Sequence, residues 1–256
     1  MVLPSFRVDG QIAVVTGAGS GLGEAIGLGL AEAGAAVVLT ELPDLLARAE
    51  RVAARVREQS GEAYAVPLDV TAVDSIQRMV EAALDRYGRI DILVNNAGIQ
   101  IRRRALEVSE DDWDRVLAVN LRGVFFCAQR VGRHMVARRQ GRIINIASQN
   151  GLVGMEDRAA YCASKAGVIN LTRVLALEWA EFGINVNAVA PTFVRTPLTA
   201  PMWEDPALHA GVLRRIPLGR LAEPRDVVGA VVYLASPAAA MVTGATLVVD
   251  GGWTAV

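Results

Sequence analysis

The chain has 256 residues, with 26 lysine and arginine side chains against 27 aspartate and glutamate side chains, and a net charge of −1. A balance this even gives no whole-chain attraction to nucleic acid or to anionic lipid, so neither is an expected partner. No linker or internal repeat interrupts the sequence, and we therefore expect residues 1–256 to form a single domain.

Other features of the sequence are typical of a soluble protein. The amino terminus has no continuous apolar core followed by a small-residue cleavage site, so no secretory signal is expected. The longest uncharged stretch, 229–249, contains Pro237 and Gly244, which favours a helix, a turn and a strand over a membrane span. Cys127 and Cys162 lack metal-ligand spacing to a histidine and are predicted to be buried free thiols. We expect a cytoplasmic protein without a metal site.

Short β-branched runs alternate with longer helical runs along the whole chain. The predicted strands are residues 12–16, 37–41, 64–68, 90–95, 142–147, 184–190 and 246–250. Because these runs are apolar nearly throughout, they are typical of a parallel sheet covered by helices on both faces. Seven such strands favour an α/β fold with one open, doubly wound, Rossmann-type sheet over an eight-stranded barrel.

Capping patterns predict where three of the helices begin. Thr71 stands three residues before Asp74, and Ser109 three residues before Asp112, which is the spacing of a capping box. Pro224 suits the first turn of a helix. In a doubly wound sheet, ligands bind beyond the carboxyl ends of the strands, so we expect the site residues in the loops that follow strands.

The first predicted strand continues into a glycine-rich turn, residues 16–23, before a helix. The glycines do not fit G-x-G-x-x-G, because Leu22 occupies the place of the third glycine. The turn still lets backbone N–H groups approach a pyrophosphate at the positive end of the helix. Glycines that serve only a tight turn are the alternative. The expected cofactor contacts in this turn are Gly17, Ser20, Gly21, Leu22 and Gly23.

The second predicted strand ends at Glu41, where an acid commonly hydrogen-bonds a ribose hydroxyl of the adenosine half of a dinucleotide. A carboxylate there repels the 2′-phosphate of NADP. Neither the glycine turn nor Leu42 supplies an arginine to attract that phosphate. The sequence therefore favours NAD over NADP, the alternative being that Glu41 only faces solvent.

The third and fourth predicted strands also end in candidate cofactor residues. Asp69, followed by Val70, places a carboxylate where it can meet the adenine amino group. After the fourth strand, Asn95 offers an amide, and Ala97 and Gly98 allow a close backbone approach.

Lys165 is the one lysine among the 26 cationic side chains, and it follows Tyr161 by four residues. The run 158–182 has the composition of a long helix ended by Gly183, which puts both side chains on one helix face. A nearby ammonium favours the phenolate and lowers the pKa of a phenol toward neutrality. Tyr161 is therefore a candidate general acid/base, chance placement of the lysine being the alternative.

Five motifs in order along the chain resemble those of the short-chain dehydrogenase/reductase family, and the similarity extends to Asp250-Gly251-Gly252. The resemblance implies an NAD(P)-dependent oxidoreductase acting on CH–OH groups of a small molecule, and a homotetramer built from long helices and the C-terminal strand. The motifs are Thr16-Gly17-x-x-x-Gly21-x-Gly23, Asn95-Asn96-Ala97-Gly98, Asn120, Ser148 and Tyr161-x-x-x-Lys165.

The resemblance also implies a role for each catalytic candidate. Tyr161 passes a proton to or from the substrate oxygen while hydride moves between the nicotinamide and the substrate carbon. Lys165 holds the nicotinamide ribose and lowers the pKa of Tyr161. Ser148 hydrogen-bonds the substrate oxygen. Asn120, in the helix that begins near Ser109, holds a water that connects Lys165 to solvent.

Residues 191–196, after the sixth strand, resemble the family's segment that meets the nicotinamide carboxamide, with Val194 and Thr196 in contact. Thr192 stands where glycine is common, which puts the local backbone path in doubt. Residues from about 192 to 217 are expected to form a substrate lid. Three larger side chains of this lid are Met202, Trp203 and His209.

Within the family, the chain looks most similar to sugar-acid and polyol dehydrogenases such as gluconate 5-dehydrogenase and 2-deoxygluconate 3-dehydrogenase. Arg102, Arg103 and Arg104 offer a guanidinium to a substrate carboxylate, or form a solvated basic turn. Two other functions stay open. A 3-oxoacyl carrier-protein reductase shares the catalytic residues but usually takes NADPH, and a non-catalytic nucleotide-sensing protein would use the same fold without turnover.

Overall fold

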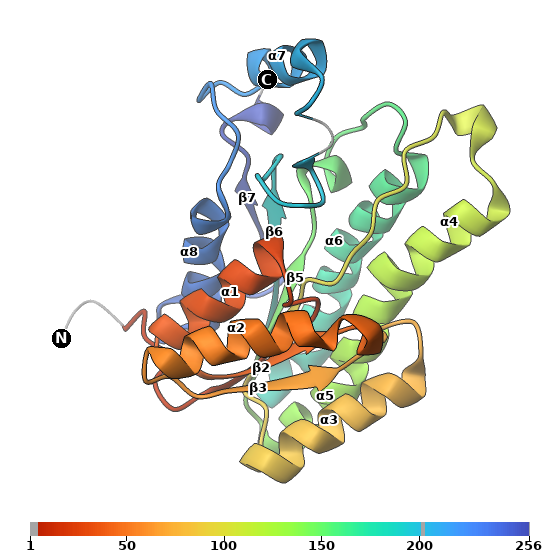
Figure 1. Ribbon diagram of the computed structural model, residues 1–256. Coiled ribbons are helices and arrows are strands. Elements are labelled where there is room, and N and C mark those ends of the chain that lie inside the picture. The colour runs from red at the N-terminus through yellow and green to blue at the C-terminus, as the bar shows by residue number, and fades with distance from the viewer. Residues whose placement is uncertain (1–4, 201–202, 256) are drawn as a thin grey trace.

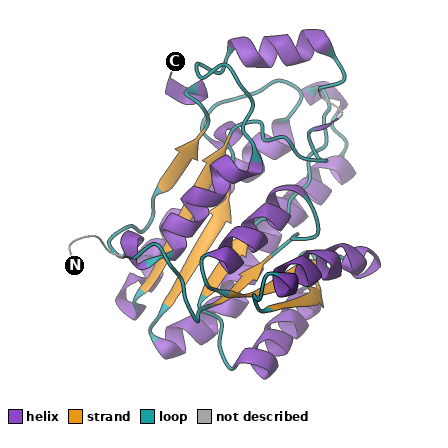
Figure 2. Ribbon diagram, turned by 60° about the vertical axis from the view of Figure 1, so that its left-hand side comes forward, coloured by secondary structure: helices purple, strands orange, loops and turns teal. Residues whose placement is uncertain are grey.

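The computed structural model describes residues 5–200 and 203–255, and its centre is a seven-stranded parallel sheet (Figures 1 and 2). The strands lie in the order β3-β2-β1-β4-β5-β6-β7, as the doubly wound fold requires. Each lies within two residues of its predicted range at either end. Their bounds are β1 (Ile12–Val15), β2 (Ala36–Glu41), β3 (Ala63–Pro67), β4 (Ile92–Asn95), β5 (Gly141–Ile146), β6 (Ile184–Pro191) and β7 (Thr246–Val249).

Helices connect the strands and cover both faces of the sheet (Figure 2). The α-helices are α1 (Gly21–Glu32), α2 (Leu46–Glu58), α3 (Val73–Tyr87), α4 (Glu110–Leu117), α5 (Val124–Arg138), α6 (Ala159–Trp179), α7 (Pro206–Arg214) and α8 (Pro224–Ala235). A π-helical segment, η3 (Ala118–Gly123), joins α4 to α5. Short 3-10 turns are η1 (Pro43–Leu45), η2 (Ala105–Glu107), η4 (Gln149–Gly151), η5 (Ala180–Phe182), η7 (Pro237–Ala239) and η8 (Trp253–Ala255).

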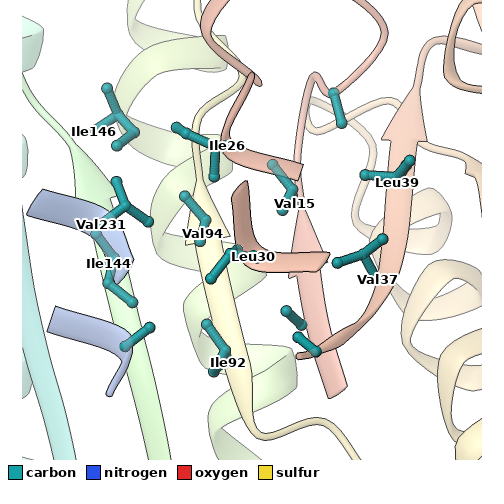
Figure 3. Packing of buried hydrophobic residues seen from close by; sticks show 14 of the residues in the cluster. Val15, Ile26, Leu30, Val37, Leu39, Ile92, Val94, Ile144, Ile146 and Val231 are labelled. Carbon is teal, nitrogen blue, oxygen red and sulfur yellow. The ribbon is translucent and has the colours of Figure 1, made fainter. Parts of the chain in front are cut away.

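The strands are apolar throughout because alternate side chains enter two different cores. In β1, Ala13 and Val15 face the core formed with α1, α2 and α8, whereas Ile12 and Val14 face the core formed with α3, α5 and α6. Figure 3 shows side chains of the first core, where Ile26 of α1 lies close to the strand residues. This arrangement confirms the predicted fold class.

The helix starts confirm the prediction for Pro224 and the serine half of the capping box predicted at Ser109. Ser109 caps α4, since its Oγ accepts from the N–H of Asp112 at 3.0 Å, and Pro224 is the first residue of α8. The capping box predicted at Thr71 is wrong. Thr71 is instead hydrogen-bonded to Asp69, whose carboxylate accepts from the N–H of Thr71 at 2.8 Å and from its hydroxyl at 2.7 Å. Helix α3 therefore begins after Ala72 without a side-chain cap.

The two cysteines are free, but they differ in burial. Cys127 lies in α5 with its side chain in the core, and burial raises the pKa of its thiol to about 12. Cys162 is only partly buried, so the prediction of two buried thiols holds for one of them. Among the described residues, no helix is both long enough and apolar enough to cross a bilayer.

A buried carboxylate, Asp91, fixes the start of β4. Its Oδ2 accepts from the N–H of Ile12 and from Nε of Arg89, and its Oδ1 accepts from Nη2 of Arg138, each at 2.9 Å. The predicted strand began at Ile90. The carboxylate of Asp91 therefore joins the start of β1, the start of β4 and α5. This contact lies at the amino ends of the strands, opposite the glycine turn.

We expect Asp91→Ala to lower the free energy of unfolding by about 3 kcal/mol, because it leaves a buried N–H and two guanidinium groups without their acceptor. Urea unfolding followed by circular dichroism measures the change. Asp111→Ala is the matched control, since Asp111 is exposed and meets Arg115 only at 3.7 Å; its effect should stay within about 0.5 kcal/mol. Equal losses in both variants would contradict the structural role of Asp91.

Candidate active site

A cavity of about 520 Å³ lies at the carboxyl ends of the central strands. Chain order reverses between β1 and β4, which is where ligands bind in sheets of this type. Two predicted site residues, Asn95 and Asn120, do not line the cavity, and the roles of the others remain predictions. Those that line it are Gly17, Ser20, Gly21, Leu22, Gly23, Glu41, Asp69, Val70, Ala97, Gly98, Ser148, Tyr161, Lys165, Val194 and Thr196.

The glycine turn forms one wall of the cavity. Gly17 has a φ of 63°, in the left-handed region that favours glycine. A Cβ on Gly23 would lie 2.1 Å from the carbonyl oxygen of Gly17, so no side chain fits there. The turn therefore presents bare backbone at the N-terminus of α1, which suits the pyrophosphate of a dinucleotide.

The loops that follow β1 and β4 are tied together at the floor of the cavity. Oγ1 of Thr16 accepts from the N–H groups of Asn96 and Ala97, both at 2.9 Å. In return, Nδ2 of Asn96 donates to the carbonyls of Thr16 and Gly17, both at 3.0 Å. Asn96 also lines the cavity, although the sequence had singled out its neighbour Asn95 as the contact.

The structure corrects the expectation for Asn95, which lies in the core. Its Nδ2 donates to Oδ1 of Asn145 at 2.9 Å, and Nδ2 of Asn145 donates to Oγ1 of Thr172, also at 2.9 Å. Asn95 is the last residue of β4, and strand alternation turns its side chain away from the cavity. These amides join β4, β5 and α6 instead.

Glu41 lies at the end of β2, whereas Ser148 follows β5 and lines the cavity with Tyr161. Because β1 and β4 separate β2 from β5 in the sheet, Glu41 and Tyr161 stand at opposite ends of the cavity. Its Oε2 accepts from the N–H of Gly19 at 3.2 Å and its Oε1 from the N–H of Leu42 at 3.0 Å. Sequence reasoning considered only neighbouring positions and missed Arg48. The turn at η1 brings Arg48, in the first part of α2, back to line the same cavity as Glu41.

Ser148 and Tyr161 both line the end of the cavity beside β5. Ser148 follows β5 and is buried, with its Oγ accepting from the N–H of Asn150 at 3.1 Å. Tyr161 lies in the first turn of α6 and lines the cavity together with Ser148. Lys165, one turn later, donates from Nζ to the carbonyl of Ile146 at 2.7 Å, with Nζ 5.8 Å from the centre of the Tyr161 ring.

The electrostatics of this end differ from the sequence expectation. Burial raises the pKa of Tyr161, while the hydrogen bond from Ser148 and the charge of Arg158 act in the opposite direction. Burial also lowers the pKa of Lys165 to about 8. The ammonium of Lys165 is directed at a backbone carbonyl, and the charge of Arg158 is one of the effects that lower the pKa of Tyr161.

Asn120 lies in the π-helical segment η3, not in a regular helix continuing from Ser109. It is fully buried, and its amide pairs with the backbone of Ile99: Oδ1 accepts from N–H at 2.8 Å and Nδ2 donates to C=O at 2.9 Å. Nδ2 also donates to Oγ of Ser164 at 3.2 Å. Asn120 therefore holds the loop after β4 against α6, and its part in a proton relay remains a prediction.

The three consecutive arginines lie outside the cavity and face acidic residues. Arg102 and Arg104 approach Asp157 at 3.9 and 3.5 Å, and Arg103 approaches Asp112 at 3.5 Å. All three side chains are exposed, as expected for the alternative of a solvated basic turn.

The segment after β6 resolves the question raised by Thr192. This residue is not in the left-handed region, and its N–H donates to the carbonyl of Val249 at 3.0 Å, so the backbone accepts a side chain here. Farther along, Phe193 packs edge-on against Trp203, which lies beside His209. Met202, also expected in the lid, lies outside the described residues.

Known proteins share this sequence and fold. A family model described as enoyl-(acyl carrier protein) reductase matches residues 17–254. The chain is 42% identical over 256 residues to 2-dehydro-3-deoxy-D-gluconate 5-dehydrogenase of Escherichia coli (strain K12), which covers 100% of both chains. The chain belongs to the short-chain dehydrogenase/reductase family.

Two more members of the family are similar over nearly their full lengths. A 3-oxoacyl-(acyl-carrier-protein) reductase of Synechocystis is 42% identical over 243 residues, covering 94% of this chain and 96% of the relative. The crystal structure of a gluconate 5-dehydrogenase from Burkholderia cenocepacia J2315, in complex with NADP and tartrate, has a TM-score of 0.96 and 39% identity, with 100% of both chains covered.

As a short-chain dehydrogenase/reductase, the protein is an oxidoreductase that acts on CH–OH groups and uses a nicotinamide cofactor. The cavity fits such a group. Bare backbone at Gly17 and Gly23 faces the N-terminus of α1, Glu41 lies at the end of β2, and Tyr161 and Lys165 lie at the end beside β5. A dinucleotide is elongated and carries its diphosphate at the centre. Its adenosine half would meet Glu41, its diphosphate the glycine turn, and its nicotinamide half Tyr161 and Lys165.

The lowered pKa of Lys165 predicts a dependence of stability on pH. Its pKa is about 8 in the folded protein against an ordinary 10.5, so the unfolded chain binds more protons between these values. The free energy of unfolding of this short-chain dehydrogenase/reductase should then rise with pH across this window. Relative to Lys165→Met, wild type should gain about 3 kcal/mol between pH 8 and 10.5. Urea unfolding at several pH values measures the difference, and a constant difference would contradict it.

Proposed function

We propose that the protein is an NAD(H)-dependent dehydrogenase that interconverts a secondary alcohol and a ketone in a sugar acid, a polyol or a similar small hydroxy compound. The observation that carries the proposal is the meeting of Ser148, Tyr161 and Lys165 at one end of a cavity that has a glycine turn and Glu41 along the rest of its length. The experiment is a screen of NAD⁺ reduction over sugar acids, polyols and simple secondary alcohols, repeated with NADP⁺.

The bound nicotinamide supplies or accepts the hydride. In the oxidation direction, the Tyr161 oxygen takes the proton from the substrate hydroxyl, and in reduction it returns that proton to the carbonyl oxygen. Oγ of Ser148 hydrogen-bonds the same substrate oxygen and so orients it toward Tyr161. Nζ of Lys165 donates to the carbonyl of Ile146, and its remaining N–H groups would hold the ribose of the nicotinamide half.

The cofactor preference rests on two opposite charges. Glu41 accepts hydrogen bonds from ribose hydroxyls and repels a 2′-phosphate, which favours NAD. Arg48 lines the same cavity and attracts that phosphate, so it offsets part of the repulsion. Among the relatives, the gluconate 5-dehydrogenase structure contains NADP. We propose a preference for NAD that is smaller than Glu41 alone would give.

Two other functions compete with the proposed dehydrogenase of sugar acids and polyols. A reductase of 3-oxoacyl carrier-protein substrates is favoured by the 42% identity to the Synechocystis enzyme, and such a reductase would use NADPH, which Glu41 disfavours. A non-catalytic nucleotide-sensing protein would need none of the catalytic side chains, yet Asn120, Ser148, Tyr161 and Lys165 are all present. The substrate and cofactor screen distinguishes all three.

The lid and the assembly are parts of the same proposal. Residues 192–217 would close over the substrate as a lid on an otherwise single domain, and this is supported by a small apolar cluster, separate from the two sheet cores, in which Phe193 and Val212 pack.

A homotetramer is supported by apolar side chains left exposed on α6 and around β7, such as Leu177 and Met241. Cytoplasmic location is supported by the unpaired cysteines.

Tyr161→Phe should lower kcat by ~10²–10⁴-fold, because the variant has no hydroxyl to carry the proton. NADH binding, measured by fluorescence titration, should change little, since the ring still packs. The control is Tyr233→Phe on α8, which removes a phenol hydroxyl far from the cavity and should leave both quantities unchanged. Turnover within threefold of wild type in Tyr161→Phe would remove Tyr161 from the mechanism.

The cofactor proposal predicts the ratio of kcat/KM for NAD⁺ to that for NADP⁺. Wild type should favour NAD⁺ by ~30-fold, which corresponds to about 2 kcal/mol of net repulsion after Arg48 offsets part of the effect of Glu41. The double change Glu41→Ser with Leu42→Arg should narrow or reverse the ratio, and Arg48→Gln should raise it. A wild type that prefers NADP⁺ would show that Glu41 does not face the ribose.

A further inference from the structure

Arg122 has no part in the catalytic scheme, yet its guanidinium is held by two contacts. Nη1 donates to the carbonyl of Thr71 at 2.8 Å, and the guanidinium carbon lies 4.9 Å from the centre of the Phe126 ring. Arg122 is exposed, and an unconstrained arginine at the surface samples many rotamers. A planar guanidinium that rests on an aromatic face has fewer directions open to its N–H groups. The ring of Phe126 therefore aims Arg122 at the loop that follows β3.

The loop that receives this hydrogen bond forms part of the cavity wall. Asp69 and Val70 line the cavity, and Thr71 comes next in the chain. Thr71 is bound twice: its N–H and hydroxyl donate to the carboxylate of Asp69, and its carbonyl accepts from Arg122. The N–H of Asp69 donates in turn to Oγ of Ser75 in α3, at 3.0 Å. The direction of the Asp69 carboxylate thus depends on Thr71, and the position of Thr71 depends on Arg122.

Close packing joins the same loop to the π-helical segment η3, which contains Arg122. A Cβ on Gly123 would lie 2.9 Å from the carbonyl oxygen of Val70 and 3.0 Å from its Cβ, so the loop rests directly on the backbone of η3. Two residues before Arg122, Asn120 pairs with the backbone of Ile99 in the loop after β4. One short segment therefore holds two of the loops that surround the cavity, and Arg122 serves the loop after β3.

We propose that Arg122 is a positioning residue for the adenosine half of the cofactor. By holding Thr71 it fixes Asp69, so that the carboxylate is directed at the place of the adenine amino group before the cofactor binds. Such preorganisation raises affinity, because the loop loses less conformational freedom on binding. The proposal rests on the predicted contact between Asp69 and adenine. Arg122 does not line the cavity and acts only through the loop.

The test measures binding of NADH and of ADP-ribose, which carries the adenosine half and the diphosphate without the nicotinamide. Arg122→Met keeps an apolar stem over Phe126 and removes every donor. Its Kd should rise ~5-fold for both ligands, the size expected for the loss of one hydrogen bond. NADH is titrated by fluorescence, and ADP-ribose by its displacement of NADH. A rise for NADH alone would place the defect at the nicotinamide end and overturn the proposal.

A double-mutant cycle tests whether Arg122 acts through Asp69. Asp69→Ala removes the carboxylate and should raise the Kd for ADP-ribose by ~10-fold. If Arg122 acts by fixing that carboxylate, adding Arg122→Met to Asp69→Ala should raise the Kd no further, and additive losses would overturn the proposal. An unchanged Kd in Asp69→Ala would show that the adenine contact is wrong, and the proposal would fall with it. An unchanged Kd in Arg122→Met alone would overturn only the positioning role.

Two further variants are the controls. Arg122→Lys keeps a cation and a donor above Phe126, and its Kd values should stay within about twofold of wild type. Arg139 has matching contacts, since its guanidinium carbon lies 5.7 Å from the centre of the Phe182 ring and its Nη2 donates to the carbonyl of Glu181. It stands between α5 and the start of β5, at the opposite end of the sheet from the cavity. Arg139→Met should leave both Kd values unchanged, and a loss equal to that of Arg122→Met would overturn the proposal.

Steady-state kinetics give the second readout. In Arg122→Met, the KM for NAD⁺ should rise ~5-fold while kcat and the KM for substrate stay within about twofold of wild type, because the adenosine half takes no part in hydride transfer. A lower kcat with unchanged cofactor binding would show that Arg122 acts on the catalytic end, through Asn120, and would overturn the proposal. The binding measurements need no substrate, so they stand apart from whether the dehydrogenase activity itself is found.

Discussion

The hydroxyl of Thr16 is the contact on which the cavity depends. It accepts two N–H groups from the loop after β4 while Asn96 returns two hydrogen bonds to the backbone of the glycine turn. These bonds hold apart and align the two loops between which the chain order of the sheet reverses. The bare backbone of the turn then faces the cavity at a fixed distance from the β4 loop, whose other side is held by Asn120.

Burial decides the chemistry at the catalytic end. Burial removes part of the water around the ammonium of Lys165 and the phenol of Tyr161, which opposes the charged form of each. Nζ of Lys165 donates to the carbonyl of Ile146, and a hydrogen bond from Ser148 opposes the effect of burial on the pKa of Tyr161. A buried group therefore becomes charged most easily when its proton moves directly to or from a neighbouring group. A general acid/base requires such a proton transfer.

Much of the fold could be predicted from the sequence, because the strands are uninterrupted apolar runs and the glycine turn follows the first of them. Spacing and order also predicted that Ser148, Tyr161 and Lys165 share one cavity, and their catalytic roles remain predictions. Spacing could not reveal Arg48, which a turn returns to the cavity, or the inward orientation of Asn95. It also could not show that Asp69 would take the hydrogen bonds of Thr71, or that Lys165 would be directed at a carbonyl. Each miss involves a side-chain direction or a competing partner that only tertiary packing determines.

The use of a single lysine has a consequence for the chemistry of the outer surface. Lys165 is 4% exposed, and every other cationic side chain is an arginine. The folded chain thus offers acylating reagents no exposed lysine amine. An amine-selective reagent would leave the side chains of the folded protein unmodified, and acylation at Lys165 would report the opening of the site around it.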